Sequence, residues 1–135
     1  MINTVCERSF RMISFDNFRM QDGSPIYVQI LLYIKRGIIA GMISDGDELP
    51  SRRVLSALLG VNPNTVQKAY KMLEDEGLIQ SHTGAKSYVV VTVAKLREIR
   101  EELLEDDAKN AVDSLKMMGV SKEEAHALID KYWEV

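Results

Sequence analysis

The middle of the chain, residues 49–79, carries two short amphipathic helical patterns that meet at a turn. In the first pattern Ser51 is a favoured N-cap residue, and Gly60 suits the left-handed position that ends a helix. Three leucines at helical spacing form its predicted inward face: Leu55, Leu58 and Leu59. The pattern predicts a helix that is followed at once by a tight turn.

The second pattern, residues 62–76, has stronger boundary signals. Asn62 is a preferred N-cap, Pro63 fits the first helical position, and Gly77 follows the last periodic residue. One stripe of four residues is predicted to be buried: Val66, Ala69, Tyr70 and Leu73. Two helices joined in this way predict a helix-turn-helix.

The elements on either side complete a winged-helix order. A preceding helix is predicted from a cap and first-turn proline in Gly23-Ser24-Pro25 to Gly41. Its apolar stripe is Tyr27, Ile30, Leu31, Ile34 and Ile38. After the second pattern, residues 78–79 and 88–91 read as two strands joined by a loop over residues 82–86.

The two ends of the chain differ in character. In the N-terminal extension, four apolar residues can form a short extended segment over a core: Ile13, Phe15, Phe18 and Met20. Met12 is a second candidate for the translation start. Beyond residue 93 a helical segment is predicted to Met118, and Ser121 opens a capping box for a last helix that ends near Trp133.

The apolar stripe of the long C-terminal segment changes phase. Leu96, Ile99 and Leu103 share one line, whereas a second line about a quarter-turn round holds Leu104, Ala108, Ala111, Leu115 and Met118. We expect either a kink near residues 106–107 or a stripe that touches two different surfaces.

The predicted fold class is mainly α with a small β-hairpin. It comprises an N-terminal extension over residues 1–22, a winged-helix DNA-binding domain over residues 23–92 and a helical region over residues 93–135. A chain of 135 residues with 46% apolar residues can bury a compact core. It is too short to hold a large enzyme domain beside another module.

Composition indicates a cytoplasmic protein. The single cysteine, Cys6, excludes an internal disulfide framework and fits a reducing compartment. The most apolar run, residues 26–34, is far shorter than the roughly 20 residues of a membrane span. The first residues also lack the continuous apolar core of a signal peptide, so no membrane partner is expected.

The net charge of −3 is unevenly distributed. Residues 1–92 hold 10 basic and 9 acidic side chains, whereas residues 93–135 hold 7 and 11. The acidity therefore lies in the C-terminal region. DNA binding requires only a local basic face on the first part of the chain.

Such a face is predicted on the helix-turn-helix. A helical projection puts Asn64, Lys68 and Lys71 opposite the buried stripe, with Thr65 and Gln67 on its flanks. Amides and hydroxyls can read base edges, and lysines can neutralise phosphates. The other candidate DNA-binding residues are Arg52 and Arg53 on the first helix, Asn62 at the cap, and Thr83, Gly84 and Lys86 in the wing.

Asn62 and Pro63 serve mainly to start the helix, and a lysine taken singly usually lies on a solvated face. The conjunction of basic and amide residues on both helices and in the wing favours the DNA interpretation.

Other chemistry is not supported. His82, His126 and Cys6 lack the spacing of metal ligands, so no metal or cofactor is expected. The acidic run over residues 101–107 fits a solvated helix face. The wing segment at residues 84–87 lacks the upstream glycine of a phosphate-binding loop. With no nucleophile beside a base, the chain is not expected to be an enzyme.

With these residues in view, the chain resembles the GntR family of bacterial transcription regulators over residues 25–90, and its short acidic tail is similar to the YtrA-type subfamily. The matching motifs are Pro25-Ile26-Tyr27 with Gln29-Ile30, Gly41, Gly46-Asp47, Leu49-Pro50-Ser51 with Arg53 and Leu55, Leu58 with Gly60-Val61-Asn62, Thr65-Val66 with Lys68-Ala69-Tyr70, Leu73, and Glu76-Gly77-Leu78-Ile79. The tail motif is Met118-Gly119-Val120 followed by Ser121-Lys122-Glu123-Glu124.

The resemblance implies a regulator, expected to be a repressor, that binds a pseudo-palindromic operator in double-stranded DNA as a homodimer. It implies that the helices of residues 93–135 form the dimer interface. It also implies DNA contacts at positions matching Arg53, Asn62, Pro63, Asn64, Thr65, Gln67, Thr83 and Gly84. The wing departs from the usual Gly-x-Gly, because it reads Gly84-Ala85-Lys86.

Two alternatives stay open. A winged helix can also bind a protein partner without DNA, because fold alone does not decide function. Met117-Met118 and Tyr132-Trp133 are interpreted as core or dimer interface, and a pocket for an unknown small-molecule effector between subunits remains the other interpretation. The operator and the regulated genes are not encoded in any motif of the chain.

Overall fold

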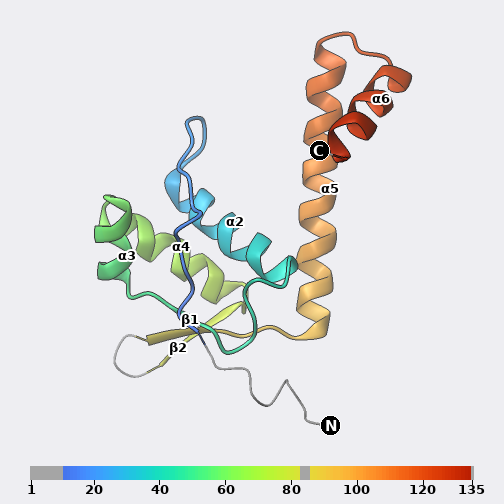
Figure 1. Cartoon of the computed structure of the whole chain (residues 1–135). Coiled ribbons are helices and arrows are strands. Elements are labelled where there is room, and N and C mark those ends of the chain that lie inside the picture. Colours follow the sequence, from blue (N-terminus) through green and yellow to red (C-terminus); the bar gives the residue numbers. More distant parts are fainter. Residues whose placement is uncertain (1–10, 83–85, 135) are drawn as a thin grey trace. The chain divides into compact units, whose positions relative to one another are not determined.

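A computed structural model describes residues 11–82 and 86–134. The chain divides into two compact units, with the boundary between Arg97 and Glu98. In the first unit three helices lie over one side of a small sheet (Figure 1). The second unit is helical. The mainly α fold class predicted from the sequence is confirmed.

The first helix, α2 (Ile26–Ile39), buries Ile30, Leu31, Ile34 and Ile38, as its stripe predicted. Its start was predicted incorrectly. Pro25 is the N-cap and not the first helical residue, because its ψ of 143° is extended, and no side chain caps the helix. Gly41, with φ of 80°, follows the end of the helix as expected.

The helix-turn-helix comprises α3 (Arg52–Leu59) and α4 (Pro63–Asp75). The predicted caps are confirmed: Ser51 Oγ accepts from the Val54 N–H at 3.1 Å, and Asn62 Oδ1 accepts from the Asn64 N–H at 2.8 Å. Gly60 adopts the left-handed conformation at φ of 68°. Local capping chemistry therefore sets both ends of the turn.

The predicted inward face of α3 was partly wrong. Leu55 is fully buried and Leu59 is half-buried, but Leu58 is 62% exposed. Ser56 is buried in its place, and its hydroxyl donates to the Val61 carbonyl at 2.6 Å. The buried arc of this short helix runs from Leu55 toward Ser56, which turns Leu58 outward.

The core of the first unit forms around α4. Its predicted stripe is buried, and α4 packs against α2, α3 and strand β2 (Ile79–His82). A charged pair also links α2 to the end of α4. Lys35 is 5% exposed, and its Nζ lies 2.6 Å from Glu76 Oε1.

The sheet is antiparallel with strand order β1-β3-β2, where β1 is Glu48–Leu49 and β3 is Lys86–Val89. The predicted hairpin is confirmed, but its strands extend further toward the turn: Ile79 pairs with Val89, and His82 pairs with Lys86. Strand β1 was not predicted, because two residues are too short to show alternation.

Residues 11–18, here called the N-terminal strap, cover part of α2 and the outer edge of β1. The Ile13 N–H donates to the Glu48 carbonyl, and the Glu48 N–H donates to the Arg11 carbonyl, both at 2.8 Å. Ile13, Phe15 and Phe18 are buried as predicted. Met20 is 48% exposed, because the extended segment that points side chains inward ends before it.

Helix α5 (Val93–Met117) is continuous through residues 106 and 107. Its two apolar lines differ in burial: Ile99 and Leu103 are buried, whereas Leu104 and Val112 are exposed. In the second unit the chain turns at Gly119 into α6 (Lys122–Trp133), where Ser121 Oγ accepts from the Glu124 N–H at 3.1 Å as predicted. None of the described helices is both long and apolar enough to cross a membrane.

Candidate nucleic-acid interface

The outward face of α4 presents the predicted polar side chains. Asn64, Gln67, Lys68 and Lys71 are exposed, and Thr65 is half-buried at the flank. This follows from the periodicity of the helix, because burial of Val66, Ala69, Tyr70 and Leu73 turns the intervening residues outward. Amide groups and a hydroxyl near the N-terminus of the helix can approach a base edge or a phosphate.

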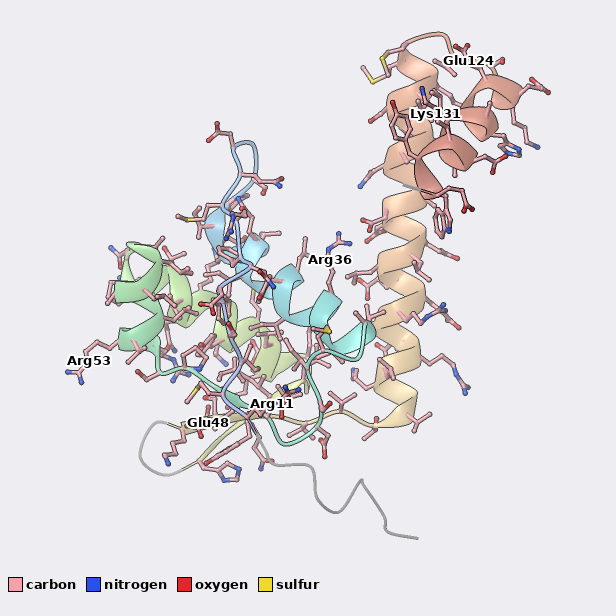
Figure 2. All side chains as sticks on the ribbon, in the orientation of Figure 1. Arg11, Arg36, Glu48, Arg53, Glu124 and Lys131 are labelled. Atoms are coloured by element: carbon pink, nitrogen blue, oxygen red, sulfur yellow. The ribbon has the colours of Figure 1, made fainter. Side chains whose placement is uncertain are left out.

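The two arginines at the start of α3 have different environments. The Arg53 side chain extends away from the helix (Figure 2) and is exposed. Arg52 is half-buried, with its guanidinium carbon 5.3 Å from the centre of the Tyr70 ring. Its Nε is buried with no hydrogen-bond partner among the described residues. The structure therefore presents Arg53 to solvent and packs Arg52 against the fold.

The two lysines of α4 also differ. Lys68 Nζ lies 4.1 Å from the centre of the Tyr27 ring on α2, which is a cation–π distance. Lys71 Nζ lies 2.9 Å from Asp75 Oδ1 one turn further along α4. The hydrogen bond to Asp75 and the charge of that carboxylate raise the pKa of Lys71. An adjacent carboxylate leaves Lys71 less net positive field than Lys68 for a phosphate.

Asn62 is occupied by its capping role, since its side-chain oxygen already accepts the Asn64 N–H. In the wing, Lys86 is exposed at the start of β3, opposite His82. The His82 ring packs edge-on against Tyr88 at 5.2 Å. Thr83 and Gly84, which were predicted as wing contacts, lie outside the described residues.

Tyr70 couples the two helices of the motif. Its hydroxyl donates to the Pro50 carbonyl, just before α3, at 2.6 Å within the core. Burial raises the pKa of Tyr70, and the charge of Arg52 opposes this only in part. The hydroxyl therefore remains a donor, and α4 is held to the chain that leads into α3.

Tyr70→Phe is expected to lower the free energy of unfolding by about 1–2 kcal/mol, because the buried Pro50 carbonyl loses its donor. Since the folded pKa is raised, the stability from this hydroxyl is complete below about pH 10, the ordinary tyrosine value, and falls as the pH rises above it. Urea denaturation at pH 7 and pH 10.5 measures both effects.

Tyr33→Phe is a matched control, because the Tyr33 hydroxyl donates to the Ser14 carbonyl at an exposed position. The loss there is expected to be about 0.5 kcal/mol. Equal stability of Tyr70→Phe and the unmodified protein would contradict the proposed link.

No group of three or more His, Cys, Asp or Glu side chains comes together as a metal site within residues 11–82 and 86–134. Cys6 lies outside these ranges. His82 lies in the wing and His126 on α6.

The fold and the exposed polar face define a winged helix-turn-helix protein. Comparison with known proteins gives the family. Residues 26–89 match the family model of bacterial regulatory proteins, gntR family. The chain is 34% identical over 110 residues to the HTH-type transcriptional repressor YtrA of Bacillus subtilis, covering 81% of this chain and 85% of that one. The protein belongs to the GntR family of bacterial transcription regulators.

Solved structures agree with this assignment. A GntR family transcriptional regulator from Listeria monocytogenes matches with a TM-score of 0.71 and 31% identity, covering 83% of this chain and 98% of that one. YtrA from Sulfolobus acidocaldarius, a GntR-family transcription factor, matches with a TM-score of 0.53 and 31% identity, covering 90% and 97%. The similarity therefore extends beyond the winged helix into the C-terminal helices.

Sequence reasoning missed the role of Tyr27. We assigned it only to the apolar stripe of α2, whereas its ring lies against Lys68 of α4. A helical projection treats each helix separately, and no pattern within one helix indicates which residue of another helix it contacts.

Proposed function

We propose that this protein is a cytoplasmic, sequence-specific DNA-binding repressor that binds a pseudo-palindromic operator as a homodimer. The observation that carries the proposal is the exposed polar surface of the helix-turn-helix. Within the part of the chain that the structure describes, the side chains of Arg53, Asn64 and Gln67 have no hydrogen-bond partner. Their donors and acceptors are available to DNA, whereas the Asn62 side chain is used by the fold.

The chemistry of this surface fits a major groove. Asn64 and Gln67 can each donate to and accept from the edge of adenine, and Arg53 can bind guanine or a phosphate with two parallel hydrogen bonds. Thr65 offers a hydroxyl and a methyl group. Lys68 and Lys86 add sequence-independent attraction to phosphates. Arg52 and Lys71 are proposed to contribute less, because both already interact within the chain.

The second unit supports a homodimer. Helix α6 buries none of its described residues, although it carries Leu128, Ile129, Tyr132 and Trp133. The exposed fraction is 80% for Trp133, and on α5 it is 50% for Leu104 and 48% for Val112. Contiguous apolar side chains of this size typically mark an interaction surface. A second copy of the same helices would cover them by a two-fold arrangement.

A two-fold dimer presents two α4 helices to half-sites about one helical turn of DNA apart. The test is a fluorescence anisotropy titration with DNA from upstream of the protein's own operon and with a scrambled sequence at matched salt. The operator fragment is expected to bind at least about a thousandfold more tightly, as specific sites usually do. Equal affinity for both fragments would instead favour the winged helix as a protein-binding module.

A further inference from the structure

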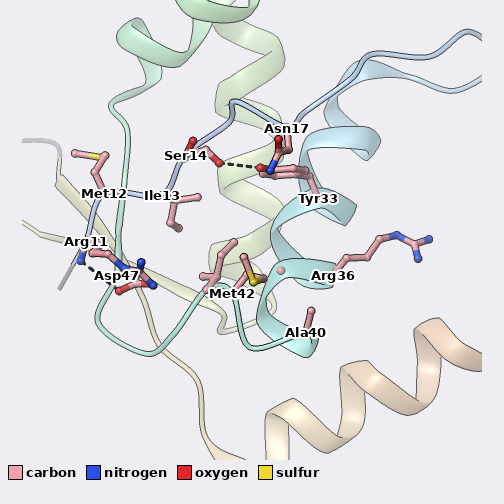
Figure 3. A pocket seen from close by; sticks show the side chains of 12 residues that line it. Arg11, Met12, Ile13, Ser14, Asn17, Tyr33, Arg36, Ala40, Met42 and Asp47 are labelled. Carbon is pink, nitrogen blue, oxygen red and sulfur yellow. Dashed lines mark hydrogen bonds between the residues drawn. The ribbon is translucent and has the colours of Figure 1, made fainter. Parts of the chain in front are cut away.

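A cavity of about 440 Å³ lies between the N-terminal strap and the second half of α2 (Figure 3). This volume lies within the range of small-molecule sites. The strap contributes Met12 and Ile13, and α2 contributes the small residues Gly37 and Ala40. The strap precedes residues 26–89, which match the family model, so this half of the cavity lies outside the matched region.

The walls of the cavity are held in place by the fold. The Tyr33 hydroxyl donates to the Ser14 carbonyl at 2.8 Å, and backbone hydrogen bonds attach the strap to Glu48. On the opposite wall, Gly37 packs so closely against Ile43 that a Cβ at Gly37 would lie 2.5 Å from Ile43 Cδ1. A ligand would therefore have to order little of the protein when it binds.

The apolar surface at this cavity indicates a ligand with an apolar body. Met12 and Met42 both line it, with exposed fractions of 53% and 72%. Exposed apolar side chains around a hollow are typical of a binding site. Methionine adapts its shape to different apolar groups, because its side chain is unbranched and flexible.

The charges at the cavity favour an anion. Arg11 and Arg36 line it, with the Arg36 side chain extending from α2 away from the strap (Figure 3). Of the described lining residues, only Asp47 carries a carboxylate. Asp47 is 2% exposed, and its oxygens accept from the Ser44 N–H at 2.9 Å and the Arg11 N–H at 3.4 Å. That carboxylate is turned into the fold, whereas rotation of Arg36 can bring its guanidinium to a ligand.

We propose that this cavity binds a small amphiphilic carboxylate, with its alkyl or aryl body between Met12 and Met42 and its carboxylate toward Arg11 and Arg36. The site is distinct from the proposed DNA surface, whose residues lie on α3, α4 and the wing. Binding can therefore be measured on the full chain in the absence of DNA, so its failure leaves the proposed DNA binding untouched.

The experiment is a titration of the full chain, labelled with ¹³C at the methionine methyl groups, with octanoate. Saturable shifts are expected for the methyl signals of Met12 and Met42, without shifts for Met117 and Met118 on the second unit. Octylamine, which has the same alkyl length and the opposite charge, is expected to bind at least about tenfold more weakly. Equal binding of octylamine, or shifts confined to Met117 and Met118, would overturn the proposal.

A pair of double variants tests the charge assignment. Arg11→Gln with Arg36→Gln is expected to raise the Kd for octanoate about tenfold, because the carboxylate loses its charged partners. Arg19→Gln with Arg53→Gln removes the same charge from exposed positions outside the cavity and is expected to change the Kd less than about twofold. An equal loss in both double variants would show a general charge effect and would contradict the site.

Discussion

Arg53→Ala is expected to weaken operator binding by about tenfold to a hundredfold while leaving the free energy of unfolding unchanged. The side chain is exposed at the start of α3, so its removal leaves no cavity. A bidentate contact to guanine contributes about 1–3 kcal/mol of discrimination, which corresponds to this range. Anisotropy titrations at several salt concentrations measure the affinity and its salt dependence.

The salt dependence also indicates which group Arg53 contacts. Loss of a phosphate contact weakens binding to all sequences and reduces the salt slope by about one, whereas loss of a base contact mainly reduces discrimination. Thr65→Ala is expected to weaken binding as well. Unchanged affinity in both variants would exclude this face of the helix-turn-helix as the contact surface.

Lys71→Ala is a matched control for Arg53→Ala. Both variants remove one positive charge from the helix-turn-helix, but the Lys71 ammonium is already paired with Asp75 at 2.9 Å. The expected loss of affinity is about twofold or less. A loss as large as that of Arg53→Ala would mean that net charge alone, and not the position of Arg53, determines binding.

Leu104→Glu combined with Val112→Glu is expected to convert the dimer into a monomer and to lower operator affinity by about a hundredfold or more. Both residues lie on the exposed apolar side of α5, where burial of a carboxylate in an interface would be costly. Two linked half-site contacts gain about 10²–10⁴ in affinity over one, and a monomer loses that gain. Light scattering after size-exclusion chromatography gives the oligomeric state.

The control adds the same two charges to the other side of α5, as Asn110→Glu with Ser114→Glu. These positions are exposed and polar and lie more than a third of a turn from the apolar line. This variant is expected to remain a dimer with operator affinity close to that of the unmodified protein. If the unmodified protein is itself a monomer, or if the Leu104 and Val112 variant stays dimeric, the apolar face is not the interface.

Features that depend on neighbouring residues were predictable from the sequence. The caps at Ser51, Asn62 and Ser121 and the left-handed Gly60 follow from the residue type and the few positions around it. The buried stripe of α4 follows from one period in one helix. A short helix such as α3 contains too few turns to fix its rotation, so Leu58 was assigned to the wrong face.

Features that join distant segments were not predictable. Strand β1 has two residues and exists because β3 pairs with it, and the strap lies along β1 because Glu48 shares its backbone groups with Arg11 and Ile13. Arg52 and Lys68 were both predicted to face DNA. Their positions against Tyr70 and Tyr27 depend on how separate helices pack.

The sequence by itself determined the helix-turn-helix, its caps and the polar outward face of α4, because helical periodicity and capping are local properties of the chain. Only the tertiary structure decided that Arg53 is presented to solvent while Arg52 packs on Tyr70, and that the strap encloses a cavity beside α2. Those outcomes depend on which side chains meet across the core, and that is set by the packing of elements far apart in sequence.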